Sequence, residues 1–267
     1  MVITRRAFVG TLAVLPATRL RAAGYPIGLE TYCFHDVDLD TTISHVASLG
    51  LRHLELHDGH LPRDAPKARI ESARQALERA GMTATGVYIH DAFTSEEAVA
   101  RPILAFARTM GFGYINGAPR PESLPLLNRI APEYGVRIAI HNHGPGARYE
   151  TLEDVTRVLE PHTNLRACID IGHFARSRVD PVRATRVLGA RAVAIHVKDV
   201  DARGENTVVG EGTIDMAGVF RAMRESGFNG LVVLEYEGDF DNMEKRLDGM
   251  RKSLANMHRM IEAASPR

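Results

Sequence analysis

Four short apolar segments in the second half of the chain each end in side chains that can bind a metal ion or transfer a proton. Short apolar runs are typical of buried strands, and a strand presents its last side chains at one edge of a sheet. The repetition of this pattern predicts a shared site. The segments are residues 137–143, 167–173, 193–199 and 231–235, which end in His141 and His143, in Asp170 and His173, in His196, Lys198 and Asp199, and in Glu235.

Two imidazoles and two carboxylates at the ends of successive strands predict a site for one divalent metal ion. This donor set suits Mn²⁺, Fe²⁺, Co²⁺ or Zn²⁺ and leaves positions for water or substrate oxygens. The alternative is a hydrogen-bonded polar cluster without metal, in which Asp170 caps a helix and His173 lies at the surface. The expected ligands are His141, Asp170, His196 and Glu235.

Ligating histidines usually donate their second N–H to an acceptor. Asp199 and His143 are the natural partners for this role, because each lies two or three residues from an expected ligand.

The elements that position these side chains alternate regularly along the chain. The intervals between predicted strands average about 29 residues, and helical patterns fill them. Glycines stand where the helices should end, at positions 50, 81, 111, 135 and 227. Strands are predicted to begin near residues 27, 51, 83, 114, 136, 165, 193 and 231. Helices are predicted at 39–49, 66–80, 95–109, 123–134, 152–159, 181–189, 215–226 and 241–262.

Eight such βα units predict one domain, residues 24–267, folded as a closed (β/α)₈ TIM barrel whose strand C-terminal ends form the active face. An open doubly wound sheet is the main alternative, but no Gly-x-Gly-x-x-Gly follows the first strand. The histidines support the barrel rim as the site, because eight of the twelve fall at or just after predicted strand ends. These are His35, His57, His60, His90, His141, His143, His173 and His196.

The composition is that of an ordinary globular protein. The 267 residues are 45% hydrophobic, and 33 Lys and Arg residues balance 33 Asp and Glu residues, which disfavours nucleic acid and anionic membranes as partners. Cys33 and Cys168 lie in apolar runs, so we expect buried thiols rather than a disulfide. No apolar run approaches the ~20 residues that cross a membrane. The oligomeric state stays open, a homo-oligomer included.

The first 23 residues resemble an export signal. Arg5-Arg6 forms a twin-arginine motif before a short apolar stretch, and Ala22-Ala23 is a candidate cleavage site. We therefore expect residues 1–23 to be a twin-arginine signal peptide and the protein to be periplasmic. A basic N-terminus of a cytoplasmic protein is the alternative.

An ordered set of motifs resembles the sugar phosphate isomerase/epimerase superfamily, the xylose isomerase-like TIM barrels that also include type IV endonucleases. Residues 24–135 resemble the family mainly in architecture. The motifs are His141-Asn-His143-Gly-Pro-Gly, Asp170-Ile-Gly-His173, Asp180-Pro181, His196-Val-Lys198-Asp199, Gly210-Glu-Gly212 with Ile214-Asp215, and Leu234-Glu235-Tyr236.

The resemblance implies one divalent ion (Mn, Zn, Co, Fe or Mg) held by Asp170, His196, Glu235 and the residue that ends strand five. Family epimerases usually have a glutamate at that last position, and two glutamates exchange the proton beside a metal-bound carbonyl. This chain has His141 there, so the two-glutamate mechanism does not transfer unchanged.

A metal ion would still stabilise the enediolate that forms when the proton next to a carbonyl leaves. The candidate bases are Glu235, His141 and His173, and Lys198 would supply positive charge to a hydroxyl or oxyanion, unless it is a surface lysine. The expected substrate-binding residues are Glu55, His90, His143 and Arg176. For Glu55 and His90 the alternative is a solvated loop, and for Arg176 an ion pair with Asp180.

The first functional hypothesis is a metal-dependent isomerase or epimerase acting on a free sugar or keto-sugar, because no phosphate-binding loop is evident. The second is a lyase that eliminates an aglycone from a 3-keto-glycoside, which the missing strand-five glutamate and the export signal favour. A DNA-repair nuclease needs three metal ions and a basic surface, which the charge balance disfavours. A non-enzymatic sugar-binding barrel is the fourth hypothesis.

Overall fold

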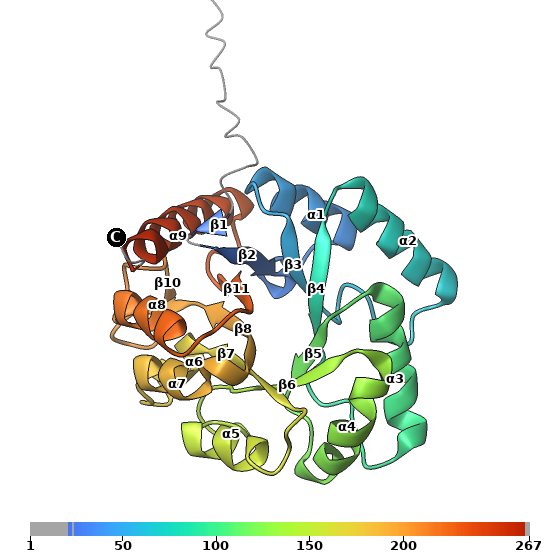
Figure 1. Ribbon diagram of the computed structural model, residues 1–267. Helices are drawn as coiled ribbons and strands as arrows, with labels where there is room; N and C mark the ends of the chain where they lie inside the picture. Colours follow the sequence, from blue (N-terminus) through green and yellow to red (C-terminus); the bar gives the residue numbers. More distant parts are fainter. Residues whose placement is uncertain (1–20, 23, 265–267) are drawn as a thin grey trace, which may run out of the picture.

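The computed structural model describes residues 21–22 and 24–264, and eight parallel strands in it close into a barrel surrounded by helices (Figure 1). The strand order is β2-β11-β8-β7-β6-β5-β4-β3, and pairing of β2 with β3 closes the ring. This confirms the predicted (β/α)₈ TIM barrel. The strands are β2 (Tyr25–Glu30), β3 (His53–His57), β4 (Thr83–Tyr88), β5 (Tyr114–Gly117), β6 (Arg137–His141), β7 (Arg166–Asp170), β8 (Ala192–Val197) and β11 (Leu231–Leu234).

The predicted helices are also present, with ends that shift by no more than a few residues. They are α1 (Leu39–Ser48), α2 (Lys67–Arg79), α3 (Glu97–Met110), α4 (Leu124–Ile130), α5 (Leu152–Leu159), α7 (Pro181–Leu188), α8 (Met216–Glu225) and α9 (Met243–Ala263). The five glycines expected at helix ends all have positive φ, the left-handed conformation that glycine adopts without steric cost.

Several short elements were not predicted. Helix α6 (Ile171–Arg176) begins directly after β7, and β9 (Asp199–Val200) pairs with β10 (Asn206–Thr207) in a small hairpin. Before the barrel, β1 (Arg21–Ala22) pairs antiparallel with β2. The remainder of the predicted signal peptide, residues 1–20 and 23, lies outside the described residues.

Apolar side chains alternate between two layers because successive residues of a strand face opposite sides. One layer packs between the strands and the helices. The other fills the barrel interior below the site, and its members are Tyr114, Ala139, Cys168, Val193, Ala194, Leu231 and Val233.

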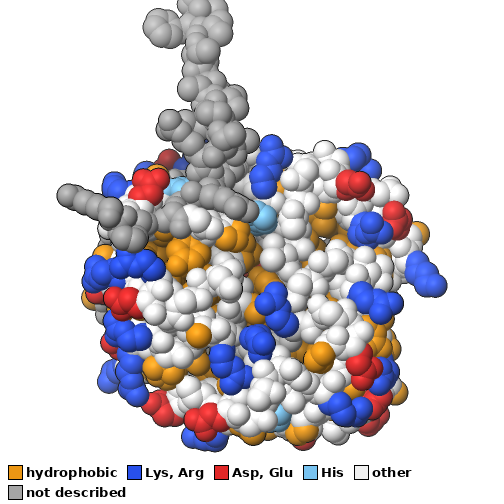
Figure 2. Space-filling view, in the orientation of Figure 1, with side chains coloured by type: hydrophobic (Ala, Val, Ile, Leu, Met, Phe, Trp, Pro, Cys, Tyr) orange, Lys and Arg blue, Asp and Glu red, His pale blue; other side chains and the backbone are white. Residues whose placement is uncertain are grey.

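Charges of both signs are interspersed around the molecule's edge in the face that Figure 2 shows, in keeping with the balanced composition. Both cysteines are buried and free, as expected. Within the described part of the chain, no helix is long and apolar enough to cross a membrane.

Candidate active site

Side chains alternate between the two faces of a strand, and this alternation places the four expected metal ligands on the inner face of the barrel. Each expected ligand lies two residues beyond a side chain of the interior layer. It therefore also points into the barrel, nearer to the C-terminal ends of the strands. All four ligands are buried. The pairs are Ala139 and His141, Cys168 and Asp170, Ala194 and His196, and Val233 and Glu235.

One ligand atom from each of these four residues lies within 4.8 Å of the other three. His141 Nε2 lies 3.3 Å from His196 Nδ1, which in turn lies 2.8 Å from Glu235 Oε2. Burial raises the pKa of Glu235 to about 7, and burial followed by the charge of His196 lowers the pKa of His141 well below its usual value. The structure therefore brings together the predicted donor set.

The two oxygens of Asp170 have different roles. Oδ1 accepts a hydrogen bond from the backbone N–H of His173 at 2.7 Å and so caps α6. Oδ2 makes no hydrogen bond within the described chain, although it is fully buried and lies 3.8 Å from His141 Nε2. Lys198 Nζ lies 3.2 Å away and offsets the charge of this oxygen, but an oxygen without a hydrogen bond keeps acceptor capacity that a second cation can use. The residues present therefore fit a divalent metal ion.

Glu55 orients His196 from below. Its Oε1 lies 2.9 Å from His196 Nε2, so the other ring nitrogen, Nδ1, faces the cluster. Tyr114 and Asn116 donate to the same carboxylate at 2.6 and 2.8 Å. Glu55 is fully buried, which excludes the solvated-loop interpretation. A carboxylate behind a histidine is the usual way to fix the tautomer of a metal ligand.

The expectation that Asp199 orients a ligand is wrong. Its carboxylate accepts hydrogen bonds from the backbone N–H groups of Gly210, Gly212 and Ile214, and it therefore holds the loop between β10 and α8. His143, the other expected partner, instead packs its ring against His173, with 3.8 Å between the ring centroids.

Lys198 is buried beneath three carboxylates, so it is not a surface lysine. Its Nζ lies 3.2 Å from Asp170 Oδ2, 3.0 Å from Glu235 Oε1 and 3.0 Å from Glu237 Oε1. Burial alone would lower the pKa of Lys198, but the carboxylates raise it well above its usual value. A Cβ at Gly172 would overlap the Lys198 stem, so glycine is required where α6 passes this side chain.

His173 and Arg176 lie on α6, beside the cluster. Sequence reasoning placed His173 in a loop, but it lies in the first turn of the capped helix. Burial lowers the pKa of His173 to about 3, so its imidazole is neutral. Arg176 donates to Gly204 O at 3.0 Å and Asn206 Oδ1 at 2.8 Å, whereas Asp180 caps α7.

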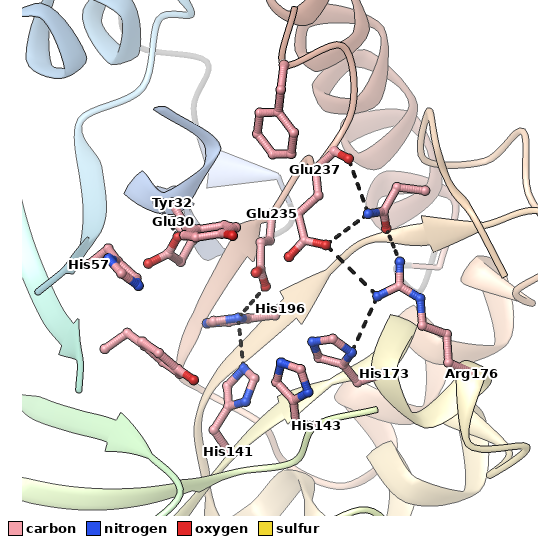
Figure 3. Close-up of a pocket in the computed structure, with 13 residues that line it drawn as sticks. Glu30, Tyr32, His57, His141, His143, His173, Arg176, His196, Glu235 and Glu237 are labelled. Atoms are coloured by element: carbon pink, nitrogen blue, oxygen red, sulfur yellow. Dashed lines mark hydrogen bonds and ion pairs between the residues drawn. The ribbon is translucent and has the colours of Figure 1, made fainter. Parts of the chain in front are cut away.

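A pocket of about 460 Å³ opens above the four ligands (Figure 3). Such a volume lies in the range of about 300–1,000 Å³ typical of small-molecule sites. His90 is exposed and bonds the hydroxyl of Tyr88 at 2.7 Å. The pocket is lined by Glu30, Tyr32, His57, Tyr88, His141, His143, His173, Arg176, His196, Asn206, Glu235, Glu237 and Phe240.

Glu30 is the most informative residue that sequence reasoning missed. It ends β2 and is 2% exposed, and its Oε1 has no hydrogen-bond partner among the described residues. Burial, and then the charges of Glu235 and Glu55, raise its pKa well above the usual value. The signal was present, because Glu30 also ends an apolar strand, but the search concentrated on the second half of the chain.

Glu237 was missed because it lies beyond the last strand. Burial would raise the pKa of Glu237, but Lys198 lowers it to about 2. The Glu237 carboxylate in the pocket wall is therefore ionised. Asn206 donates to its Oε2 at 2.8 Å, which links the β9–β10 hairpin to the site.

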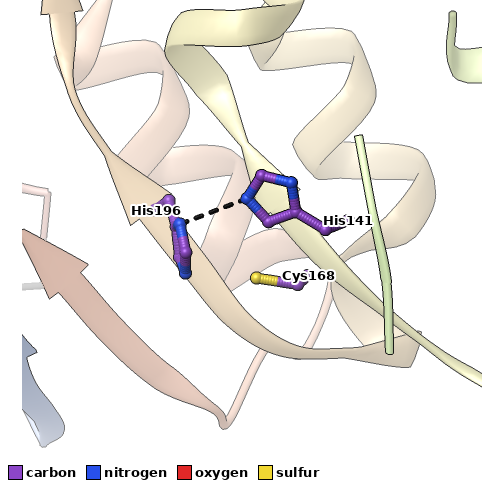
Figure 4. A group of neighbouring side chains, drawn as sticks. All are labelled: His141, Cys168 and His196. Atoms are coloured by element: carbon purple, nitrogen blue, oxygen red, sulfur yellow. Dashed lines mark hydrogen bonds between the residues drawn. The ribbon is translucent and has the colours of Figure 1, made fainter. Parts of the chain in front are cut away.

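Cys168 offers a second set of ligands below the first (Figure 4). Its thiol points toward His141 and His196, and the three ligand atoms lie within 4.8 Å of one another. However, Asn116 Nδ2 already donates to the sulfur at 3.2 Å, and burial raises the pKa of the thiol to about 11. The set that contains Asp170 is the better site for an ion that prefers oxygen and nitrogen donors.

Comparisons with solved structures show the same fold. D-psicose 3-epimerase, solved in the presence of D-fructose, is 16% identical and superposes with a TM-score of 0.74 over 88% of this chain and 99% of that one. The IOLI protein with a bound zinc atom is 15% identical, with a TM-score of 0.73 over 90% and 99%.

Sequence relatives match over a shorter stretch. The rhizopine catabolism protein MocC of Rhizobium meliloti is 32% identical over 158 residues, which are 52% of this chain and 48% of MocC. An inosose dehydratase of Geobacillus kaustophilus (strain HTA426) is 30% identical over 138 residues, 44% of each chain. The matches thus span just under half the length of these relatives. The profile of the xylose isomerase-like TIM barrel family matches residues 43–260, and this chain therefore belongs to that family.

Proposed function

We propose that the protein is a divalent-metal-dependent isomerase or epimerase that removes and returns a proton beside the carbonyl of a sugar or keto-sugar. The observation that carries this proposal is the buried four-residue donor set, in which Asp170 Oδ2 makes no hydrogen bond within the described chain and the other three residues line a pocket. An ion held by these residues would polarise the carbonyl and stabilise the charge that develops when the neighbouring C–H bond breaks.

In this proposal, two groups in the pocket move that proton. Glu30 and His173 lie on opposite sides of Glu235 (Figure 3). Epimerisation needs one group to take a proton from one face of the carbon and another to deliver a proton to the opposite face. Epimerases of this kind usually use two glutamates, and this chain has His141 in place of one of them. We propose that Glu30 supplies the missing carboxyl group, beside that of Glu235.

Three further side chains of the pocket bind and orient the substrate. Arg176, Asn206 and Glu237 are held by one another on one wall and offer both donors and acceptors to hydroxyl groups. Lys198 neutralises the carboxylates at the floor and keeps Glu235 and Glu237 in place.

Incubation with a panel of ketoses in D₂O tests the function. The metal-loaded protein should incorporate deuterium at the carbon next to the carbonyl, as measured by mass spectrometry and NMR. Asp170→Asn should lose both the metal and the exchange, whereas Asp248→Asn, an exposed carboxylate on α9, should lose neither. No incorporation with any ketose by fully metal-loaded protein would exclude this function.

A second candidate is elimination, in which the same proton abstraction expels a leaving group from a keto-glycoside. The match to inosose dehydratases and the replacement of the strand-five glutamate by His141 favour it. In this reaction one of Glu30 and His173 takes the proton and the other protonates the departing oxygen. Release of a chromogenic aglycone from an oxidised glycoside separates elimination from epimerisation.

We further propose export through the twin-arginine pathway, supported by the Arg5-Arg6 motif and the apolar stretch that follows it. Residues 1–23 fused to a reporter should direct it to the periplasm, and replacing both arginines by lysine should retain it in the cytoplasm. A reporter that stays cytoplasmic with the unaltered segment would contradict export.

A further inference from the structure

An aromatic cluster at the mouth of the pocket has no role in the chemistry proposed above. We define this aromatic lip as Tyr32, His35 and Phe240. The Tyr32 and His35 rings stack at 4.7 Å between centroids, and Phe240 packs edge-on against His35, also at 4.7 Å. Tyr32 and Phe240 line the same pocket as the metal-ligand set, so the lip is continuous with the site.

The side chain of Phe240 is exposed to solvent. It is 38% exposed and is one of two large hydrophobic side chains that the described structure leaves open to solvent. The other is Val187 on α7, which does not line the pocket. An exposed aromatic ring beside a pocket is typical of a binding surface.

A buried arginine holds Phe240 in this position. Arg246 is fully buried on α9, donates to Phe240 O at 2.5 Å, and places its guanidinium 4.9 Å from the centre of the Phe240 ring. The same guanidinium donates to both oxygens of Asp36, at 2.6 and 3.0 Å, and to Cys33 O. It therefore ties the loop after β2 to the loop after β11, the two loops that carry the lip.

The two sides of the pocket differ in chemistry. The floor and one wall are charged or polar, with Arg176, Asn206 and Glu237 on the wall. The lip presents aromatic faces, which bind flat apolar surfaces through stacking or edge-to-face contacts.

We infer that the aromatic lip is a second subsite, which binds the ring attached through a glycosidic oxygen to the keto-sugar at the floor. The ring is the aryl aglycone or second sugar of a glycoside, both of which offer an apolar face. This inference rests on the proposed function for the identity of the reacting sugar and goes beyond it in assigning a two-ring substrate.

Calorimetric titration of metal-loaded protein with three keto-glycosides, carrying methyl, phenyl and glucosyl groups, tests the subsite. Binding is measured rather than turnover, so the result does not depend on catalysis. We expect the phenyl compound, the glucosyl compound or both to bind roughly 3- to 10-fold more tightly than the methyl compound. The phenyl and glucosyl arms distinguish an aryl aglycone from a second sugar.

Variants at Phe240 test whether the aromatic lip causes the tighter binding of the two-ring compounds. Phe240→Ala should abolish the preference for two rings, so that the phenyl and glucosyl compounds bind this variant no more tightly than the methyl compound does. Phe240→Tyr should retain the preference, and Val187→Ala is the matched control for loss of an exposed hydrophobic side chain. Thermal unfolding verifies that each variant is folded.

The possible failures are distinguishable. Equal affinity of the wild type for all three compounds, or a preference that survives Phe240→Ala, would overturn the subsite and leave the proposed function intact. Failure of every keto-glycoside to bind metal-loaded protein would also overturn the subsite, whereas the proposed function would still be decided by deuterium exchange with free ketoses.

Discussion

At the scale of single residues, the site depends on how Asp170 divides its two oxygens. Oδ1 caps α6, whereas Oδ2 makes no hydrogen bond and faces Lys198, so the cap interpretation and the proposed metal ligation concern different atoms of one side chain. The sequence predicted the position of this acid but not the division, because the cap depends on a helix too short to recognise from periodicity.

The choice between the two ligand sets is testable by the spectrum of Co²⁺-loaded protein. Thiolate ligation gives an intense ultraviolet charge-transfer band, and nitrogen and oxygen ligands do not. We expect no such band in the wild type and an unchanged visible spectrum in Cys168→Ala, because Asn116 already donates to the buried sulfur and the set that contains Asp170 offers a carboxylate instead. A strong band that disappears in Cys168→Ala would show that the lower set binds the ion.

The role of Glu30 is testable with Glu30→Gln, which keeps the size of the side chain and an oxygen to accept from the Tyr32 N–H. Loss of a proton-transfer group typically costs about 10²–10⁴-fold in rate. We expect deuterium exchange to fall by that factor while the metal content stays at the wild-type level. The matched control is Glu71→Gln, an exposed carboxylate on α2. Undiminished exchange in Glu30→Gln would remove Glu30 from the mechanism.

At the scale of elements, regular helices and strands were predictable and short ones were not. The strands of the barrel are apolar runs bounded by glycine-terminated helices, so local pattern suffices to locate them. Helix α6 and the β9–β10 hairpin are held mainly by contacts with distant residues, such as the Arg176 bonds to Gly204 and Asn206. Their positions depend on the closed barrel, which no local pattern encodes.

The N-terminus of helix α5 is stabilised by a capping box that is recognisable in the sequence, and its contribution to stability can be measured. Thr151 and Asp154 form a capping box, each side chain bonding the other's backbone N–H. Thr151→Ala should lower the free energy of unfolding by about 1 kcal/mol, measured by urea denaturation at pH 7. Thr156→Ala, within the same helix, is the control and should have little effect.

The loss of stability caused by Thr151→Ala should depend on pH, because Asp154 must be ionised to contribute to the capping box. The hydrogen bond from Thr151 lowers the pKa of Asp154 below the usual value of an aspartate. The carboxylate's contribution is therefore present above that value and is lost as pH falls through the lower pKa of the folded state. The difference between Thr151→Ala and the wild type should shrink below about pH 3. A difference that grows in acid would contradict this assignment.

At the scale of the whole molecule, closure of the barrel brings the site together. Glu55 and His196 are 141 residues apart in sequence, yet their side chains lie 2.9 Å apart because β3 and β8 face each other across the interior. Sequence reasoning brought the four proposed ligands together because all of them end strands of the same barrel. It assigned the orienting role to Asp199 because Asp199 lies close to His196 along the chain, and it missed Glu30 because the predicted ligands and bases all came from the second half of the chain.

Anomalous diffraction from crystals of Co²⁺-loaded protein, recorded at the cobalt absorption edge, tests the central claim most directly. We expect one strong peak per chain, bounded by His141 Nε2, Asp170 Oδ2, His196 Nδ1 and Glu235 Oε2, and no peak there in crystals of Asp170→Asn. A fully loaded protein whose peak lies elsewhere, or whose peak persists in Asp170→Asn, would contradict the account.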